Sequence, residues 1–553
     1  MLLEKPLSGE WLQIKKEVDK AAEKERNGRP PFFESTISLA RRPLITSRFI
    51  LLGLLDDLTP EEAKKALGLG KDKAPYWHNP PQEVKERFKD MTILDPFAGG
   101  GSIPLEAVRL GARAIAVEYS PVQWAALKFI EVAQKNPNLI NLKAWERLKK
   151  KYRRGFGADM EAICNDPSHV EAGPLVAEGC RVAKEAKAEL EKYYPPYNGK
   201  RVSHYIWVKQ VKCPKCGAWV PLVLSFGLST RDKIYWDVEY NGNDYVVRIK
   251  RGEEREGTIR GGEAQCPRCK VSIPNEYIRK HIKGNDRLVV IRTEDSEYYP
   301  ADVEQVKAYE SVPEPERLEE EVPPNDPRSV IPPIYGYTKF GDLFNKRQHL
   351  VLNTLARKIS ALQPELKTIL AWLLAKHADY NSAFTSWHKS RENVRDTLFL
   401  KVLTMSWDYV EVNPFARGSG SLWGNLFDVI DGFAFLVEAL EDSGPLEVVF
   451  GSTTNLPYLD KSIRYVVTDP PYYDNVPYPE VYDFVYTWLK RVLGDVYPEQ
   501  FWFWTLWRDR SAEDISVGGS RTKEHFDLLI ERAFREIRRV LTDDGALVMY
   551  FAH

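Results

Sequence analysis

The feature that most constrains the fold is a strand, a glycine turn, a helix and a second strand within residues 91–118, "MTILDPFAGGGSIPLEAVRLGARAIAVE". An apolar strand ends at Asp95, and three glycines follow at positions 99–101. A helix is predicted near Ile103–Leu110, and the second strand ends at Glu118. This succession is typical of the opening βαβ unit of an open parallel sheet, so it predicts an α/β fold.

The same alternation returns near the C-terminus, in "LEVVF", "SIRYVVT", the helix "FDLLIERAFREIRRVL" and the strand "GALVMYFAH". Open sheets tolerate insertions at their loops. We therefore predict that residues 1–132 and 441–553 are two parts of one domain. The chain stops directly after a strand, so we expect that the last strands of the sheet are missing or that another polypeptide completes it.

Four segments are expected between these two parts. Residues 133–200 and 334–440 are predicted to be helical insertions, because their apolar residues recur at helical spacing. Residues 201–290 carry cysteine pairs and predict a zinc ribbon. Residues 291–333 are rich in proline and acid and predict a stiff, extended linker.

Four of the six cysteines form two Cys-Pro-x-Cys pairs, Cys213/Cys216 and Cys266/Cys269. A repeated pair of this kind in a reduced compartment predicts a structural zinc site with four thiolate ligands. The residues between the pairs, "DKIYWDVEYNGNDYVVRIKRGEE", predict a hairpin with an Asn-Gly turn. The alternatives are two unrelated reduced pairs or a redox-active dithiol.

The other two cysteines, Cys164 and Cys180, lie outside these pairs. A cysteine outside a ligand pattern behaves as a small hydrophobic residue. We therefore expect both to stand alone, buried in the core.

The glycine turn predicts a cofactor site of a particular chemistry. Glycines let backbone N–H groups approach a ligand closely, and Glu118 is positioned to accept hydrogen bonds from two ribose hydroxyls. No G-x-G-x-x-G is present, and Asp95 enters the turn. An acid at that point would repel a pyrophosphate, but it suits a cationic sulfonium or an α-amino group.

A second motif, Asp469-Pro470-Pro471-Tyr472, follows the predicted strand "SIRYVVT". A proline pair cannot continue a strand, because each proline lacks the backbone N–H and fixes φ. The motif therefore predicts a rigid corner at the end of the strand.

Together the two motifs resemble those of the S-adenosylmethionine-dependent amino-methyltransferases of nucleic acids. The cofactor signature of that family resembles Asp95-Pro-Phe97-x-Gly99-x-Gly101, and its catalytic signature resembles Asp469-Pro-Pro-Tyr472. More narrowly, the chain resembles archaeal and bacterial proteins described as adenine-specific DNA methylases that contain a zinc ribbon. The stretches that carry this likeness span residues 39–480: "ARRPLITSRFILL", "DPFAGGGSIPLEAVRLG", "CPKCGAWVPL", "GGEAQCPRC", "FGDLFNKRQ", "WDYVEVNPF" and "VVTDPPYYDNVPY".

The resemblance implies a class I methyltransferase (Rossmann-like) open sheet, interrupted by a large α+β insertion that carries the zinc ribbon. It also implies roles at the corner. Asp469 and the Pro470 carbonyl would each accept one N–H of an exocyclic amino group, Pro471 would stiffen the corner, and Tyr472 would stack on an extruded base.

Two further cofactor contacts follow from the same resemblance. "GSTTNLPY" matches the segment that contacts the adenine of the cofactor, although Ser452 replaces the acid frequent there. "RRPLITSRFILL", with Pro43, matches the segment near the methionine end of the cofactor; an amphipathic helix with proline in its first turn is equally compatible. Asn413-Pro-Phe415 lacks the second proline of a catalytic motif, so we expect a structural role for it.

The resemblance predicts methyl transfer to DNA, at adenine N6 before cytosine N4, with a flipped base as the substrate. One alternative is methylation of guanosine N2 in RNA, although "YDN" rather than a glycine follows Tyr472. Another is a zinc-ribbon scaffold that binds nucleic acid within a larger complex for defence against foreign DNA. Phosphate contacts are expected from the basic runs Lys149–Arg154 and Arg248–Arg251. The alternative for the first run is a solvated helix face.

Charge and hydropathy limit the other partners. The formal net charge is −1, so nucleic acid would have to be met by local patches rather than by a global basic field. No apolar run reaches the roughly 18–20 residues that span a bilayer, and the charged N-terminus carries no signal peptide. We expect a cytoplasmic protein with no membrane partner.

Overall fold

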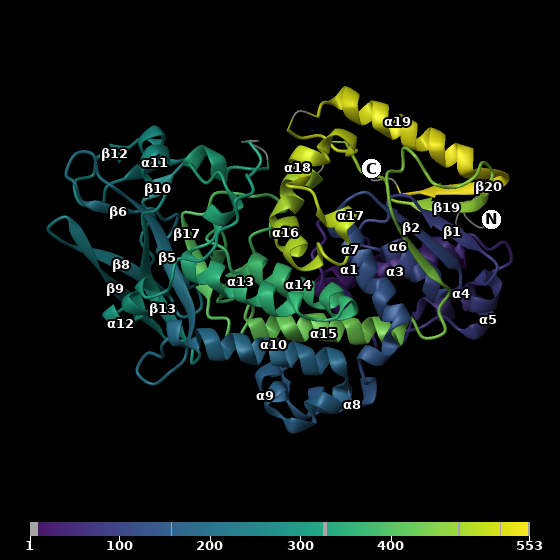
Figure 1. Cartoon of the computed structure of the whole chain (residues 1–553), viewed down its shortest axis with the longest axis horizontal. Coiled ribbons are helices and arrows are strands. Elements are labelled where there is room, and N and C mark those ends of the chain that lie inside the picture. Colours follow the sequence, from purple (N-terminus) through teal and green to yellow (C-terminus); the bar gives the residue numbers. More distant parts are fainter. Residues whose placement is uncertain (1–8, 156, 325–328, 474–475, 520, 551–553) are drawn as a thin grey trace.

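The computed structural model describes residues 9–155, 157–324, 329–473, 476–519 and 521–550. A parallel sheet lies at one end of the molecule and a group of antiparallel strands at the other, with a layer of helices between them (Figure 1).

The parallel sheet has five strands in the order β18-β2-β1-β19-β20, and every pair in it is parallel. Its strands come from both ends of the chain: β1 (Thr92–Asp95), β2 (Arg113–Glu118), β18 (Leu446–Phe450), β19 (Ile463–Thr468) and β20 (Leu541–Met549). The prediction of a parallel α/β sheet shared by these two parts of the chain is therefore confirmed.

The order of the strands defines a reversal between β1 and β19. From β1 the chain proceeds outward to β2 and then to β18, whereas β19 and β20 extend the sheet in the opposite direction. Ile93 of β1 pairs with Tyr465 of β19 across this point. In open parallel sheets the crevice for a ligand lies at such a reversal, outside the carboxyl ends of the strands.

The strands of this sheet carry apolar side chains on both sides, and each face packs against helices that keep those side chains from water. Ile93 of β1 belongs to the large core on one side, which includes α6 (Ser102–Arg109) and α3 (Leu44–Leu52). Leu94 points to the opposite side, where it joins Ile537 and Val540 of α19 (Lys523–Val540) in a separate cluster. Successive side chains of β1 point to opposite faces of the sheet, so Ile93 and Leu94 belong to different apolar clusters.

The antiparallel region is built around β5 (Val202–Lys212), an eleven-residue strand. The sheet order is β14-β13-β5-β17, and β6 (Trp219–Pro221) pairs with the end of β5. β17 (Asp408–Val412) comes from the segment predicted to be the second helical insertion, so that segment also contributes a strand.

The segment 291–333, expected as an extended linker, is folded over its first part. It contains the end of β13 (Asp286–Thr293), β14 (Tyr298–Pro300) and α12 (Val303–Glu310). Residues 325–328 of the expected linker lie outside the described residues. The linker prediction is wrong for these residues because β14 pairs with β13 and extends the antiparallel sheet.

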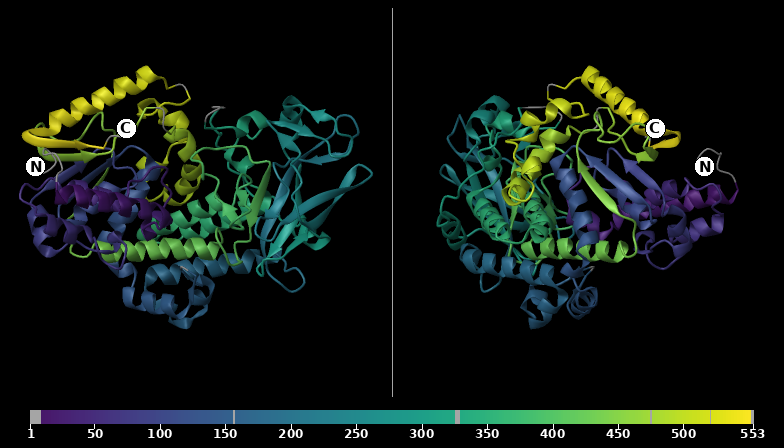
Figure 2. Two further views of the ribbon diagram at one scale, coloured as in Figure 1. Left: turned by 180° about the vertical axis from the view of Figure 1, so that it is seen from behind. Right: turned by 45° about the vertical axis from the view of Figure 1, so that its right-hand side comes forward.

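Helices fill the space between the two ends, as the two further views confirm (Figure 2). They include α10 (Pro174–Leu190), α13 (Lys346–Ser360), α14 (Pro364–Tyr380), α15 (Leu422–Ala439) and α16 (Tyr478–Leu493). α14 is buried over almost its whole length, because neighbouring helices surround it. These helices join the inserted segments to the parallel sheet through one continuous core.

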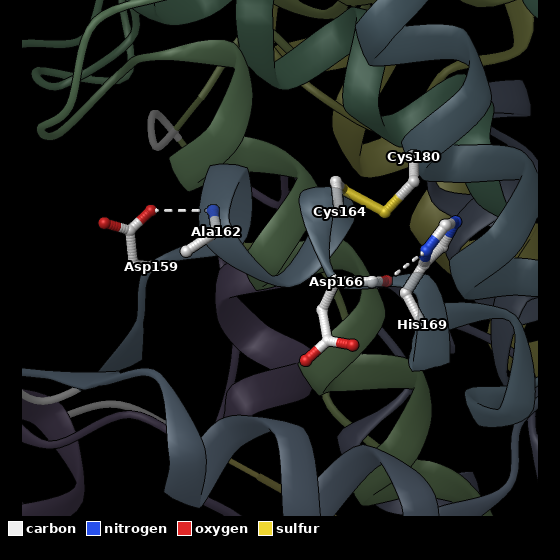
Figure 3. The surroundings of a disulfide bond; sticks show 6 residues. All are labelled: Asp159, Ala162, Cys164, Asp166, His169 and Cys180. Atoms are coloured by element: carbon white, nitrogen blue, oxygen red, sulfur yellow. Dashed lines mark hydrogen bonds between the residues drawn. A yellow bond between two sulfur atoms is a disulfide. The ribbon is translucent and has the colours of Figure 1, made fainter.

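The expectation that Cys164 and Cys180 stand alone is wrong. They form a disulfide that links α9 (Met160–Asn165) to α10, and both are fully buried (Figure 3). The turn between the helices is held locally by Asp166, whose carbonyl oxygen lies 2.7 Å from His169 Nδ1. The pairing depends on how α9 packs on α10, which the cysteine spacing does not specify.

Within the described ranges, we find no helix with the length and apolarity that crossing a bilayer requires.

Candidate functional site

A pocket of about 430 Å³ lies at the carboxyl ends of the parallel strands. Four strands end at its wall or just before it: β1 at Asp95, β2 at Glu118, β18 before Ser452 and β19 before Asp469. This is the reversal point of the sheet, where the strand ends diverge and leave a crevice. The predicted site residues that line it are Asp95, Phe97, Gly99, Glu118, Ser452, Asp469, Pro470, Pro471 and Tyr472.

Asp95 fixes the two central strands to each other at the base of the pocket. Its Oδ1 accepts a hydrogen bond of 2.6 Å from Thr468 Oγ1 and another of 3.2 Å from the Phe97 N–H. Burial raises the pKa of this carboxyl to about 7. Asp95 is therefore less a surface charge for a ligand than a buried junction between β1 and β19.

Glu118 is bonded to the glycine turn. Its two carboxylate oxygens accept hydrogen bonds from the Gly99 N–H at 2.7 Å and the Ser120 N–H at 2.8 Å. Gly99 has φ +51°, a left-handed conformation that favours glycine. Burial raises the pKa of Glu118 to about 7. Each oxygen keeps a further acceptor position, so Glu118 can still accept hydroxyl donors from a ligand.

Gly101 and Pro43 were predicted to contact a cofactor, and neither lines the pocket. Gly101 precedes α6 with φ +86°, and a Cβ there would lie 2.6 Å from Ile130 Cδ1. Glycine is needed at this position for packing rather than for ligand access. Pro43 caps the N-terminus of α3, and the two residues before it, Arg41 and Arg42, are the ones that reach the pocket.

The Asp-Pro-Pro-Tyr corner begins directly after β19, as predicted. The guanidinium of Arg42 donates to both oxygens of Asp469, from Nε at 2.5 Å and from Nη2 at 2.9 Å. Arg42 Nη2 also donates to Tyr472 Oη at 2.6 Å, and the Tyr472 hydroxyl donates to Asp469 Oδ1 at 2.8 Å. The Asp469 carboxylate thus faces the pocket as an acceptor of planar N–H donors.

The same contacts affect proton binding at the corner. Hydrogen bonding to Asp469 raises the pKa of Arg42. Burial, followed by hydrogen bonding to Asp469, raises the pKa of Tyr472 to about 12. Tyr472 is therefore a neutral hydrogen-bond donor at physiological pH, and Arg42 is charged.

A segment that follows α18 (Leu506–Asp509) closes the wall near Glu118. The Tyr119 hydroxyl donates to the Arg510 carbonyl at 2.9 Å, and Arg510 Nη2 donates to the Tyr119 carbonyl at 3.0 Å. Asp514 follows on the same segment and lines the pocket. Burial raises the pKa of Asp514, so the pocket contains a second desolvated carboxyl group near Glu118.

Two polar atoms beside Glu118 have no protein partner. Among the described residues, Ser120 Oγ and Gln123 Oε1 are buried without a hydrogen bond, and both residues line the pocket. Leaving a buried polar atom unpaired costs free energy, and because these two residues line the pocket, a ligand there can supply the missing partners.

The charge of the lining is predominantly acidic. It contains five carboxyl groups and three basic side chains (Asp95, Glu118, Asp469, Glu513 and Asp514, against Arg41, Arg42 and Lys401). Burial raises the pKa of Asp95, Glu118 and Asp514, so the negative charge that these carboxyl groups present to a ligand increases with pH.

Sequence reasoning missed several residues of the pocket, above all Arg42, Asp514 and Lys401. It also missed Thr468, which lies outside the lining and donates to Asp95. Thr468 and Arg42 adjoin predicted residues, so direct adjacency to a motif could have drawn attention to them. Asp514 and Lys401 carry no local signal, because only the packing of distant segments brings them to the pocket.

The second candidate site is the cysteine cluster of the antiparallel region. The four sulfur atoms of Cys213, Cys216, Cys266 and Cys269 lie within 4.8 Å of one another. The distances are 3.6 Å between Cys213 and Cys269 and 3.8 Å between Cys216 and Cys266. A zinc tetrahedron with Zn–S bonds of about 2.3 Å has sulfur–sulfur edges of about 3.8 Å. The cluster can therefore hold a metal ion such as zinc.

The two halves of the cluster have the same kind of backbone turn. Gly217 N–H donates to the Cys213 carbonyl at 2.9 Å, and Lys270 N–H donates to the Cys266 carbonyl at 2.9 Å. Gly217 and Lys270 both have positive φ, at +71° and +62°. Each Cys-Pro-x-Cys segment thus builds its half of the cluster locally. Between the halves, β8 (Ile234–Asn241) and β9 (Asp244–Arg251) form the predicted hairpin, with Gly242 and Asn243 at its turn.

The basic runs expected to contact phosphate form ion pairs within the chain. Lys149 pairs with Asp431 at 2.7 Å, and Lys151 with Asp166 at 2.7 Å. In the other run, Lys250 lies 2.8 Å from a carboxylate oxygen of Asp237. Their role toward nucleic acid stays a prediction, and part of their charge is compensated.

Comparison of the chain with protein-family models, with curated proteins and with solved structures gave no match.

Proposed function

We propose that this chain is a DNA methyltransferase that transfers the methyl group of S-adenosylmethionine to the N6 amino group of an adenine flipped out of the duplex. The strand order supports a class I, Rossmann-like methyltransferase sheet, because it matches the first five strands of a doubly wound fold. The observation that carries the proposal is that the glycine turn, Glu118 and the Asp469 corner all line one pocket.

The cofactor half of this pocket would bind S-adenosylmethionine through the turn and Glu118. Glu118 would accept the ribose hydroxyls while it holds the Gly99 N–H, and the orphan atoms of Ser120 and Gln123 would gain partners. The acidic lining would favour the positive charge of the cofactor, which supplies an electrophilic methyl group on its sulfonium.

The catalytic half would bind the amino group. The lone pair of an exocyclic amine is delocalised into the base, so the amine is a poor nucleophile until its N–H groups are drawn out of the ring plane. Asp469 and the Pro470 carbonyl would accept those two N–H groups, and the proline pair would keep both acceptors rigid. As the N–CH₃ bond forms, the S–CH₃ bond would break and its electron pair would stay on sulfur, which leaves as the neutral thioether S-adenosylhomocysteine. Asp469 would stabilise the positive charge that develops on the amine, and the amine would then release one proton to solvent.

Arg42 would have to yield its position. It donates to both oxygens of Asp469 in the structure, so an incoming amino group would replace at least one of these hydrogen bonds. The bidentate contact also supports the assignment of Asp469, because it demonstrates that planar N–H donors reach this carboxylate from the pocket side.

The test is nucleoside mass spectrometry of DNA incubated with the protein and S-adenosylmethionine. We expect N6-methyladenine with the intact chain and none with Asp469→Ala. Asp544→Ala, which removes an exposed carboxylate paired with Arg464 near the opposite end of β19, is the matched control and should retain full activity.

Other outcomes discriminate among the alternatives. N4-methylcytosine would retain the mechanism and change the base. N2-methylguanosine in RNA, with unmodified DNA, would overturn the choice of nucleic acid. Tight cofactor binding without any modified base would favour a nucleic-acid-binding scaffold.

A further inference from the structure

A short loop of the inserted region presents two large apolar side chains to solvent. Phe399 is 55% exposed and Leu400 is 62% exposed. Among the residues that the structure describes, they are the only exposed large hydrophobic residues that are adjacent in sequence. Single exposed apolar residues are common, but two together at the tip of a loop indicate a contact surface.

The loop is held firmly at its base. Thr397 N–H donates to the Asp379 carbonyl at 2.8 Å, and Leu398 N–H donates to Asp379 Oδ1 at 2.9 Å. Asp379 lies at the end of α14, and Leu398 is buried. On the other side, Leu403 is buried and its N–H donates to the Ser329 carbonyl at 2.8 Å. The exposed tip is therefore preorganised and would lose little conformational entropy on binding.

The loop reaches the pocket through the residue that follows the apolar pair. Lys401 lines the same pocket as Asp469 and Tyr472, and it adopts a left-handed backbone conformation with φ +59°. The turn at Lys401 ends the exposed tip and directs the chain back toward the core at Leu403. The apolar tip is thus continuous with the pocket that would receive the target base.

Cationic side chains lie on both sides of the apolar pair in the sequence, Arg395 before it and Lys401 after it. The guanidinium of Arg395 lies 4.9 Å from the centre of the Phe399 ring. Partial burial and the nearby Arg29 guanidinium together lower the pKa of Lys401. An apolar tip flanked by cations matches the chemistry of a nucleic-acid duplex, in which phosphates surround a stack of apolar base faces.

We propose that the loop Thr397–Lys401 is a wedge that enters duplex DNA at the target nucleotide. Phe399 and Leu400 occupy the base stack where the extruded base has left it, and Lys401 contacts the phosphate of that nucleotide at the pocket. This inference rests on the proposed function, because it takes the pocket as the acceptor of a flipped base. Apolar wedges between base steps offset the cost of unstacking in other DNA-bending proteins.

The first test locates the loop on DNA without requiring activity. Benzoylphenylalanine is introduced at position 399 and, as a matched control, at position 459, which is occupied by Leu459. Leu459 is 81% exposed and lies before the amino end of β19, whereas the pocket lies at the carboxyl ends of the strands. On irradiation with a radiolabelled 30-base-pair duplex, we expect crosslinks from position 399 and only background from position 459.

The second test measures what the wedge does. The double substitution Phe399→Ser/Leu400→Ser should lower the rate of methyl transfer to duplex DNA by about tenfold or more, because extrusion from a paired stack loses its support. On heat-denatured DNA of the same sequence, where no base needs to be extruded, the rate should stay within about threefold. Leu459→Ser should leave both rates unchanged. Both positions are exposed, so folding is preserved.

The outcomes separate the wedge from the activity. No crosslink above background at position 399, or an equal loss of rate on duplex and denatured DNA, overturns the wedge even if the intact protein methylates DNA. A specific crosslink at position 399 with no methylated base retains the loop as a DNA contact and rejects the proposed function. Preferential crosslinking to an RNA duplex in direct competition overturns the assignment to DNA.

Discussion

The pocket and the cysteine cluster were both predicted from short motifs, but they are assembled over very different distances along the chain. In the pocket, Asp95 bonds Thr468 across 373 positions, and Arg42 bonds Asp469 across 427. In the cluster, the closest sulfur pairs are separated by 50 and 56 positions, and each pair of cysteines is set by its own local turn. Local turns therefore determine which cysteine sulfur atoms face one another in the cluster. In the pocket, the packing of distant segments determines which side chains contact the buried carboxylates.

This difference makes the two sites separable by experiment, and the largest effect should come from the pocket. Asp469→Ala should lower the rate of methyl transfer by about 10³-fold, because it removes the carboxylate that stabilises the positive charge developing on the amine. Zinc content, measured by elemental mass spectrometry, should stay at the value of the intact chain. A parallel loss of zinc would show that the two ends of the molecule are coupled, and would break the comparison.

The reciprocal change is Cys216→Ser. It replaces one thiolate of the cluster, and we expect the affinity for zinc to fall by roughly 100-fold, measured by competition with a chromophoric chelator. The affinity for S-adenosylmethionine, measured by calorimetry, should stay within about twofold of the intact chain. Ser225→Ala, outside the cluster, is the control for zinc. Equal zinc affinity in Cys216→Ser and the intact chain would reject a four-thiolate site.

The disulfide lies in the helical part of the molecule and belongs to neither site. Cys164→Ala/Cys180→Ala removes a link between residues 16 positions apart. We expect the free energy of unfolding to fall by about 2–3 kcal/mol, because the unfolded chain regains conformational freedom. Chemical denaturation of the intact chain under reducing conditions should give the same free energy of unfolding as the double variant. The affinities for zinc and for the cofactor should be unchanged. No difference between oxidised and reduced protein would contradict the pairing.

The smallest effect concerns the proton on Glu118, whose pKa is raised from 4.5 to about 7 by burial. The ionised carboxylate favours a cationic cofactor, so the complex holds fewer protons than the free protein. Affinity for S-adenosylmethionine should therefore rise by about threefold to tenfold between about pH 6 and pH 8. In Glu118→Gln, the affinity for S-adenosylmethionine measured by calorimetry should change less with pH than in the intact chain. An unchanged slope in that variant would assign the proton to another group.

In the unliganded protein the raised pKa of Glu118 makes the folded state less stable as the pH rises, whereas it makes cofactor binding stronger. The folded state keeps the Glu118 proton up to about pH 7, whereas the unfolded chain loses it near pH 4.5. The free energy of unfolding should therefore fall as the pH rises through this window. Denaturation midpoints of the intact chain and Glu118→Gln, measured across this window, check the sign.

Much of the architecture could be predicted because it follows from local patterns. The strand that ends at Asp95, the helix after the glycine turn and the strand that ends at Glu118 lie within one or two residues of their expected bounds. Apolar runs bounded by glycine and proline determine strands strongly. The cysteine cluster was predictable for the same reason, since each half is a turn of a few residues.

The failures have a common physical origin. Cys164 and Cys180 carry no local pattern, and their bond depends on how two helices pack. Gly101 belongs to the glycine signature, but its missing Cβ makes room for Ile130 rather than for a ligand. The segment after Thr293 was expected to be a linker, and it folds because β13 offers β14 a partner strand.

The sequence by itself determined the two motifs of the pocket, the four cysteines and the parallel sheet. The motifs and the two cysteine turns depend on residues close together in the chain, where bond geometry and side-chain type leave few conformations. The sheet was predicted from the local pattern of each of its strands. Only the tertiary structure decided that Arg42 meets Asp469, that Thr468 meets Asp95 and that the loop at Phe399 reaches the same pocket. These contacts join segments hundreds of residues apart, and the burial that raises the pKa values of Asp95 and Glu118 exists only once those segments have excluded water.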